Sequence, residues 1–420
     1  MDNVDKFTLK GASGKTNWAL LALIFLMPLR NIQLQYLPSI GGGGLNVINI
    51  LLLFAIIHAY SNGKKVTVKT SLNSFLIWYV ISSLIALAFG YSYLGDLASR
   101  NWNGMKDQLT PILILFLVQR SAVDIIQWRR ILCACLISLP YSFKVVWAQY
   151  SSVSSWHYSH DLRISGTFMD LGANEMGAYS VTMALICLGC LISCWNYKKY
   201  RYIFILLFVC AGLSLLYSYS RGAYVAFLLG TIIIFIKYKN TMKLLVPSLF
   251  ILSFLLMNLP PSVEERFSSI DAEEGERDES AQSRIVVWEI VLGKFLETPI
   301  VGFGYRTAQD PRINPHEMDT HNYYIKMLVE RGIVGFITFI ALLIIFWKLA
   351  SRTLIWGEGD ELINGLILGM CGSIVALLMS NMFGDRFSHY PIMTSFWVFI
   401  ALISVIDMWR LEKREPLYDN

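Results

Sequence analysis

Residues 302–336 read GFGYRTAQDPRINPHEMDTHNYYIKMLVERGIVGF, and in this stretch a polar loop runs directly into a long apolar segment. Two of the six histidines of the chain, His316 and His321, lie in the loop. From residue 332 to Leu349 the sequence is apolar, which at about 1.5 Å per helical residue spans most of the ~30 Å hydrocarbon core of a bilayer. We therefore expect the loop to end at a membrane–water boundary and to carry the chemistry of the protein.

Hydrophobic residues make up 55% of the 420-residue chain and charged residues only 15%, against about 25% charged residues in soluble domains. Apolar runs of about 18 to 20 residues, the length of a membrane-spanning helix, recur along the chain. Continuous runs such as 362–382 lack the alternation of a membrane-spanning strand. We predict an all-α polytopic membrane protein. The net charge of +5 is small and gives no indication of nucleic-acid binding.

The apolar runs predict about twelve membrane spans. They divide the chain into nine transmembrane helices in residues 1–259, one large loop at 260–324, and three further helices with a tail in 325–420. The expected spans cover residues 18–29, 45–60, 72–94, 104–119, 131–150, 176–195, 202–219, 223–236, 244–259, 332–349, 362–382 and 391–409.

Lys and Arg are unevenly divided between the two sides of the predicted membrane. Alternate short connections hold 20 of the 35 basic residues. Such connections face the cytoplasm in membrane proteins, so we predict that both termini are cytoplasmic and that the 260–324 loop is not. A loop of this length typically has a function of its own. Its residues 281–296 predict an amphipathic helix on the membrane surface, with an apolar face made of Ile285, Trp288, Leu292 and Phe295.

Three arginines stand at the predicted outer boundary of the membrane, where a charge is costly to insert. Arg221 lies between two apolar runs with almost no connection between them, Arg163 precedes the sixth span, and Arg284 begins the amphipathic helix. One interpretation is that each side chain extends to lipid phosphates. The other is anion binding, because a guanidinium stays charged and binds phosphate oxygens in pairs. These residues alone leave both interpretations open.

His321 is the most obvious proton-transfer group near these arginines, because an imidazole titrates near neutral pH. The alternative is simple packing, which is the favoured interpretation for His316 and His389. The predicted spans hold almost no Asp or Glu in their cores, whereas a cation-coupled carrier normally needs ionisable groups there. No Asp-x-Asp pair stands on the outer side. We therefore predict neither a metal nor a cofactor.

Four sequence blocks, in this order, resemble the O-antigen ligase and polysaccharide polymerase family of bacterial membrane glycosyltransferases. The resemblance covers roughly residues 160–350. The blocks are Arg163-Ile-Ser-Gly166-Thr-Phe168 with Asn174, Ser220-Arg221-Gly222-Ala223, Arg284 with Trp288, Pro299 and Gly302-Phe-Gly304, and His321-Asn322 with Glu330, Gly332 and Gly335. The chain departs from the family pattern at Asn174, which follows an alanine instead of the usual proline.

The resemblance implies a GT-C-like fold in the bacterial inner membrane. It further implies an inverting, metal-independent transfer of a glycan from undecaprenyl diphosphate on the periplasmic face. On this basis we expect His321 to be catalytic. The expected diphosphate-binding residues are Arg221, Arg284 and Arg163, and the expected substrate-binding residues are Asn322, Arg306 and Asn174.

The expected reaction is that of an O-antigen ligase, which joins polysaccharide to lipid A-core or a similar acceptor. A polymerase of O-antigen or exopolysaccharide that uses the same chemistry is the alternative. A flippase or exporter of lipid-linked sugars is the rival from another class, but it predicts internal repeats and a charged path through the helices, and inspection of the sequence reveals neither. The expected partners are the lipid-linked glycan, its acceptor and membrane lipids, and a regulator of chain length stays open.

Overall fold

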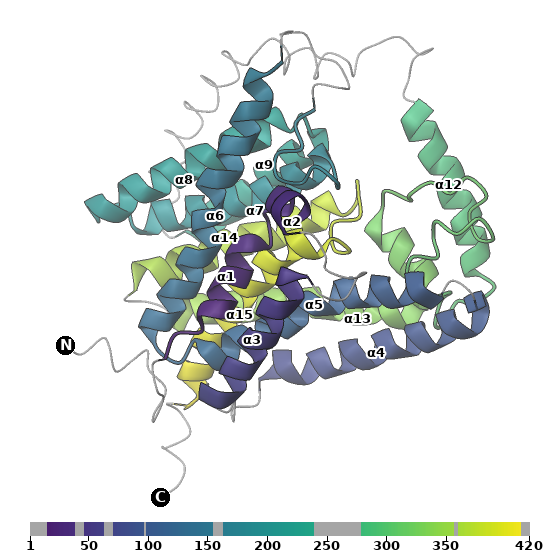
Figure 1. Ribbon diagram of the computed structural model, residues 1–420, viewed down its shortest axis with the longest axis horizontal. Coiled ribbons are helices and arrows are strands. Elements are labelled where there is room, and N and C mark those ends of the chain that lie inside the picture. Colours follow the sequence, from purple (N-terminus) through teal and green to yellow (C-terminus); the bar gives the residue numbers. More distant parts are fainter. Residues whose placement is uncertain are drawn as a thin grey trace, which may run out of the picture.

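The computed structural model describes residues 15–37, 46–62, 70–95, 98–153, 163–238, 279–356 and 360–412. These residues form thirteen helices and no strand (Figure 1). The helices are α1 (Trp18–Leu26), α2 (Arg30–Tyr36), α3 (Val47–Asn62), α4 (Ser71–Leu94), α5 (Ala98–Ser121), α6 (Ile125–Ser151), α7 (Ala173–Ser193), α8 (Lys198–Tyr217), α9 (Arg221–Lys237), α12 (Glu279–Phe295), α13 (Tyr323–Trp356), α14 (Glu361–Ser380) and α15 (Tyr390–Glu412).

Seven of these helices are long and apolar enough to cross a membrane, namely α4, α6, α7, α8, α13, α14 and α15. α1 and α2 form an eighth span only if they count as one, because the chain bends by 100° between them. The all-helical class is therefore confirmed for the part of the chain that the structure describes, and the apolar helices are those of a membrane protein.

The count of twelve spans stays a prediction. Each expected span that falls on described residues is helical, but α3 and α9 have only 16 and 17 residues. α5 is polar in its first half and contains Pro111. The expected span at 244–259, and the expected loop as far as residue 278, lie outside the described residues.

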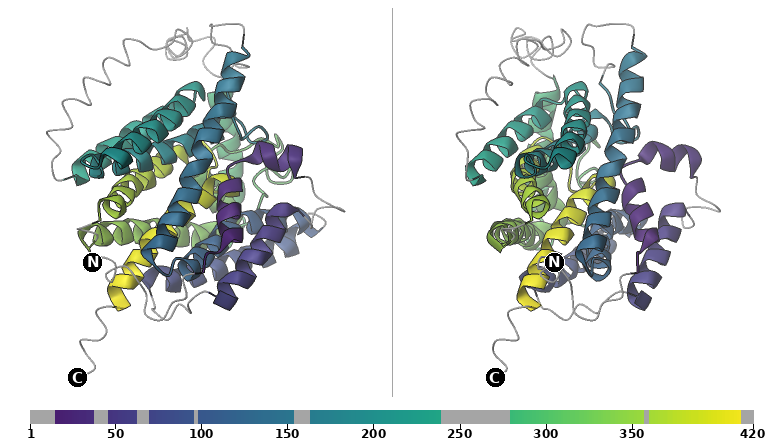
Figure 2. Two further views of the ribbon diagram at one scale, coloured as in Figure 1. Left: turned by 60° about the vertical axis from the view of Figure 1, so that its left-hand side comes forward. Right: turned by 90° about the vertical axis from the view of Figure 1, so that its left-hand side faces the viewer.

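Helices α7, α14 and α15 form the centre of the bundle, and α15 is buried along its whole length. α7 and α14 approach closely because glycines face each other: a Cβ on Gly189 would lie 2.4 Å from the carbonyl oxygen of Gly365. Small residues allow such close helix packing in membranes. Figure 2 shows α6 crossing the bundle on one side, where it packs against α1, α8 and α15.

Helices α4 and α13 run side by side along one edge of the bundle (Figure 1). α13 is broken at Gly332, whose φ of 62° and ψ of −170° lie in a region open essentially to glycine alone. At this break the amides of Ile333 and Val334 donate to the carbonyl oxygens of Pro299 and Ile300 at 2.8 and 3.2 Å. At the break, the carbonyl groups of Pro299 and Ile300 therefore accept hydrogen bonds from amides of α13 in place of carbonyl groups within the helix.

A separate small core lies beside the bundle. It joins α12, residues 296–322 and the part of α13 before the break, which we call the α12 lobe. Figure 1 shows α12 standing apart from α6 to α9. The side chains that form this core are Val287, Val291, Phe303, Ala308, Ile313 and Val329.

A helix is thus present at the position of the expected amphipathic helix at 281–296, as α12. Val287 and Val291 are buried in the lobe, while Ile285 and Leu292, two of the four expected face residues, are exposed. Residues 285–288 are all apolar, so the hydrophobic pattern is too broad to show which part faces the protein. Whether the exposed part rests on a membrane stays a prediction.

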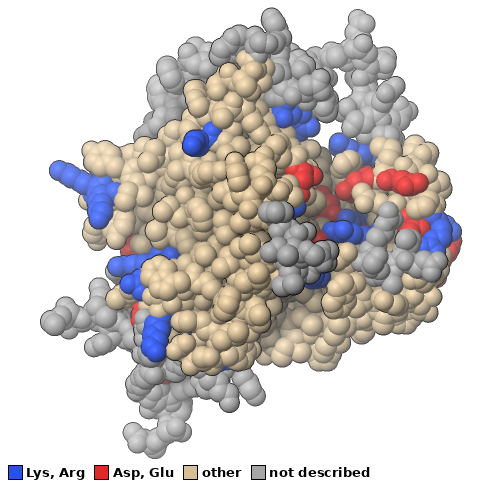
Figure 3. All heavy atoms as spheres, viewed as in Figure 1, with Lys and Arg blue, Asp and Glu red and all other residues tan. Residues whose placement is uncertain are grey.

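The two ends of the bundle differ in charge. At the end where α6 and α14 begin, Arg129 pairs with Asp360 at 2.9 Å, and Asp407 of α15 pairs with Arg352 and Arg410. Figure 3 shows several Lys and Arg side chains at the end away from the α12 lobe. It also shows acidic and basic side chains together in a hollow between the lobe and the rest of the molecule.

Candidate active site

His321 lies where the α12 lobe meets the bundle, directly before α13. Its amide donates to the Oδ1 atom of Asp319 at 3.0 Å, and the indole of Trp288 in α12 donates to the carbonyl oxygen of Thr320 at 2.6 Å. The Oδ1 atom of Asn322 accepts from the amides of Tyr324 and Ile325 at 3.0 and 3.3 Å. Asn322, expected to bind substrate, therefore caps the first turn of α13.

Two predicted site residues have backbone conformations that are uncommon for non-glycine residues. φ is 48° at His321 and 57° at Arg306, and Tyr219, two residues before Arg221, has a φ of 51°. Such strain persists only where the surrounding structure holds it, and it is frequent at functional sites. The unusual backbone at His321 thus agrees with a functional position for its side chain.

The environment of His321 favours the neutral form of its imidazole. Burial lowers the pKa of His321 below its ordinary value of 6.5, Asp319 opposes this shift, and Arg284 and Arg386 add to it. Glu175 raises the pKa of His321 to a smaller extent. A neutral imidazole has a free nitrogen lone pair, so His321 is able to accept a proton near neutral pH.

Arg284 contributes a positive charge from α12. Its charge reaches His321, although 37 positions of sequence separate the two residues. Its Nε atom is buried and has no hydrogen-bond partner in the described part of the chain. An unsatisfied buried donor of this kind costs about 1–3 kcal/mol, more when it is charged. An anion bound here would satisfy it.

Arg386 is a second arginine at His321 that the sequence analysis missed. It lies in the connection between α14 and α15 and pairs with Glu175 in the first turn of α7. The side chain of Asn381 accepts from the amide of Arg386 at 3.0 Å, and the carbonyl oxygen of Asn381 accepts from the amide of Tyr323 at 2.9 Å. Asn381 thus ties the connection to the chain that follows His321.

One feature of the local sequence indicates Arg386 as a candidate site residue. Like Arg221, it stands in a short polar interruption between two apolar runs, in Gly384-Asp385-Arg386. Gly384 leaves room for the side chain, since a Cβ there would lie 2.3 Å from the Nη2 atom of Arg386. The contact with Glu175 joins positions far apart in the chain, so no local pattern indicates it.

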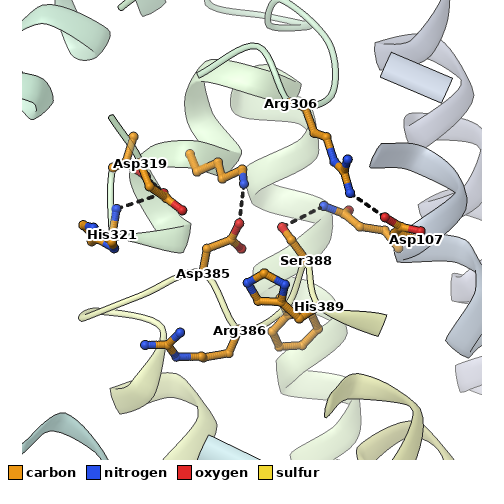
Figure 4. Close-up of polar contacts among 12 residues, drawn as sticks. Asp107, Arg306, Asp319, His321, Asp385, Arg386, Ser388 and His389 are labelled. Atoms are coloured by element: carbon orange, nitrogen blue, oxygen red, sulfur yellow. Dashed lines mark hydrogen bonds and ion pairs between the residues drawn. The ribbon is translucent and has the colours of Figure 1, made fainter. Parts of the chain in front are cut away.

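A buried ion pair fixes the same connection to α13. Lys326 in the second turn of α13 pairs with Asp385, and both side chains are buried. Burial alone would raise the pKa of Asp385, but the ammonium of Lys326 holds it below its usual range. Figure 4 shows Asp385 between His321 and His389. The Nε2 atom of His389 lies 3.9 Å from the Oε1 atom of Glu175.

Arg163, Asn174 and Ser220 meet at a neighbouring corner. The Oδ1 atom of Asn174 accepts from the guanidinium of Arg163 and from the hydroxyl of Ser220 at 3.0 Å. Arg221 follows Ser220 directly as the first residue of α9. Asn174 is followed directly by Glu175, which pairs with Arg386. This corner therefore adjoins the site around His321. The first two sequence blocks are therefore joined by side-chain contacts.

Arg306 lies apart from this group. Its Nη2 atom is 2.5 Å from the Oδ2 atom of Asp107 in α5, and about half of its side chain is exposed. In Figure 4, Arg306 and Asp107 lie on the other side of Asp385 and Ser388 from His321. The structure thus brings Arg284 to His321, and Arg163 with Asn174 to Ser220, the residue before Arg221, but it does not bring Arg306 to either group.

Within the described ranges, no group of three or more His, Cys, Asp or Glu side chains is arranged to hold a metal ion. The residues around His321 offer proton transfer by its imidazole and charge neutralisation by Arg284 and Arg386.

Comparison with known proteins identifies a related family for part of the chain. Residues 206–340 match the family model described as O-antigen ligase. The matched range covers most of α8, all of α9 and α12, and α13 beyond its break, and it includes Arg221, Arg284, Arg306 and His321. No curated protein matches the chain. The similarity to the O-antigen ligase family therefore extends over residues 206–340 of the chain.

Proposed function

We propose that the protein is a membrane glycosyltransferase that moves a glycan from undecaprenyl diphosphate to an acceptor hydroxyl. The observation that carries this proposal is the position of His321 at the junction of the α12 lobe and the bundle, where the charges of Arg284 and Arg386 help to lower its pKa, inside or beside the range matched by the family. A base next to fixed positive charges suits a reaction in which a hydroxyl attacks and a diphosphate leaves.

In the proposed step, the acceptor oxygen forms a bond to the anomeric carbon of the donor sugar, and the bond from that carbon to the diphosphate oxygen breaks. The hydroxyl proton passes to a ring nitrogen of His321, and the bonding electron pair leaves with undecaprenyl diphosphate. Arg284, Arg221, Arg163 and Arg386 neutralise the charge that collects on the leaving group. Attack from the face opposite the diphosphate gives inversion, and no metal takes part.

The proposed setting is the bacterial inner membrane, with the α12 lobe on the periplasmic side and the termini in the cytoplasm. The ion pairs of Arg129, Arg352 and Arg410 at the end away from the lobe support this orientation. O-antigen ligation and polymerisation share the proposed step and differ in the acceptor, which is lipid A-core or a similar molecule in the first and a growing glycan in the second.

The test is to reconstitute the protein in vesicles with lipid-linked glycan extracted from its parent cells. We expect release of undecaprenyl diphosphate in step with transfer of the glycan to an added acceptor. Movement of the intact lipid-linked glycan between leaflets, with no undecaprenyl diphosphate released, would instead identify a flippase.

A further inference from the structure

A second polar cluster lies on the far side of the Asp385–Tyr390 connection from His321. We propose that this cluster binds the acceptor glycan, a proposal that rests on the transferase function proposed above. The cluster gathers side chains from α2, α5, α15, the connection before α7 and the α12 lobe, and its members are Arg30, Asp107, Gln108, Asp170, Arg306 and Tyr390.

Direct contacts hold these side chains together. Arg30 pairs with Asp170 and donates from Nη1 to the hydroxyl of Tyr390 at 3.0 Å. Arg306 pairs with Asp107 at 2.5 Å. The amide nitrogen of Gln108 donates to the hydroxyl of Ser388 at 3.5 Å, two residues before Tyr390. Arg30 therefore contacts Tyr390 directly, and the Arg306–Asp107 pair lies next to Gln108, which contacts Ser388.

One polar atom of the cluster has no hydrogen-bond partner among the described residues, and two of its charged side chains are partly exposed. Gln108 is 7% exposed, and its side-chain oxygen is buried without a hydrogen-bond partner among the described residues. Arg306 and Asp170 are partly exposed, at 47% and 29% of their side chains. The cluster thus combines a buried acceptor atom, the side-chain oxygen of Gln108, with exposed donors and acceptors that a ligand can contact.

The charge of the cluster indicates the class of ligand. Arg30 and Arg306 balance Asp107 and Asp170, so these four side chains carry no net charge. Around His321 and the neighbouring corner taken together, by contrast, Arg284, Arg386, Arg163 and Arg221 outnumber Glu175 and Asp319. A neutral cluster of carboxylates, guanidinium groups and an amide suits sugar hydroxyls, which donate and accept at once, and the positive site suits a diphosphate.

The Asp385–Tyr390 connection lies between the two sites. Arg386 contacts Glu175 on one side, and Ser388 and Tyr390 contact the second cluster on the other. His389 approaches Glu175 at 3.9 Å, and its pKa is lowered by burial. An acceptor glycan several sugars long would be held at the second cluster while its reacting hydroxyl reaches His321.

Kinetics with two variants test the assignment. In Asp107→Asn and Arg306→Gln, the KM for the acceptor should rise by roughly tenfold or more, the effect of losing one charged hydrogen bond. The KM for the donor and the binding of undecaprenyl diphosphate should stay within about twofold, because the donor site is intact. Arg129→Gln is the control, since the Arg129–Asp360 pair at the other end has similar exposure, with 47% and 13% of the side chains exposed.

Two acceptor probes identify the source of the glycan. One is the oligosaccharide released by mild acid from the lipid-linked glycan of the parent cells, and the other is the lipid A-core of cells that lack the glycan. The probe whose KM rises in the variants is the ligand of the cluster.

A charge-swapped double variant, Asp107→Arg with Arg306→Asp, distinguishes a loss of acceptor binding from a loss of folding. It restores an ion pair but reverses the groups offered to a ligand, so the acceptor KM should stay high. Recovery of the normal KM in this variant, or normal KM values for both probes in the single variants, would overturn the assignment. Wild-type protein that binds undecaprenyl diphosphate but transfers to neither probe would refute the proposed function instead.

Discussion

At the scale of single residues, the polar end of the bundle contains two kinds of site residue. Arg284 and His321 were predicted from the sequence, because a charge or an imidazole at a membrane boundary is costly and conspicuous. Arg386 and Glu175 were not, although both act on the pKa of His321. Their role depends on a contact between α7 and the α14–α15 connection, which only the folded chain creates.

The pH dependence of transfer follows from the environment of His321. The neutral imidazole is the proposed base, so the rate should fall as pH decreases and the ring takes up a proton. Because burial lowers the pKa of His321, the midpoint of this acid limb in kcat/KM should lie below pH 6.5.

Asp319→Asn should move the limb to lower pH still, because Asp319 raises the pKa of His321. Glu297→Gln is a control, since Glu297 pairs with the exposed Lys294. A midpoint above pH 6.5, or an upward shift in Asp319→Asn, would contradict the role of His321 as base.

At the scale of helices, the apolar runs were sufficient to predict where helices occur. They were not sufficient to predict the bend between α1 and α2 or the break in α13. The break depends on the approach of Pro299 and Ile300 to Gly332, which is a long-range contact. The sequence blocks contained Pro299 and Gly332, but their spacing carries no information on which backbone atoms meet.

Gly332→Ala should destabilise the protein by about 2 kcal/mol or more, since a left-handed backbone costs a non-glycine residue roughly 1–2 kcal/mol. A Cβ at this position would also lie 2.3 Å from the carbonyl oxygen of Ile300. Gly293→Ala in α12 is the matched control, because a Cβ there meets nothing within 4 Å.

The control should be neutral or stabilise by up to about 1 kcal/mol, as alanine favours helix. Thermal unfolding of both variants in detergent measures the difference. Equal unfolding temperatures would show that the break in α13 is not required for folding.

At the scale of the whole molecule, the sequence predicted a helical membrane protein with its polar chemistry at one end. The bundle does separate the Arg129, Arg352 and Arg410 ion pairs from the end that holds His321 and Arg386. The number of spans is less certain from sequence, because α3, α5 and α9 are short or partly polar. Hydropathy alone does not decide whether such helices cross a bilayer.

Cysteine labelling tests the proposed orientation. A cysteine in place of Glu297 in the α12 lobe should react with a membrane-impermeant maleimide in intact cells. One in place of Lys199, at the start of α8, should react only after the cells are permeabilised. Both variants need Cys133 replaced by Ser, since it is the exposed cysteine among the seven. The reverse labelling pattern would place the lobe in the cytoplasm and exclude the proposed site from the periplasm.

The most direct measurement compares donor binding with turnover in His321→Ala and Arg284→Ala. Purified protein would be assayed for binding of undecaprenyl diphosphate and for transfer from the lipid-linked glycan, with and without chelator. Loss of the base should lower turnover by about 10²- to 10⁴-fold while His321→Ala still binds undecaprenyl diphosphate, and Arg284→Ala should weaken both binding and turnover. Near-normal turnover in His321→Ala, or transfer that chelator abolishes, would contradict the proposed mechanism.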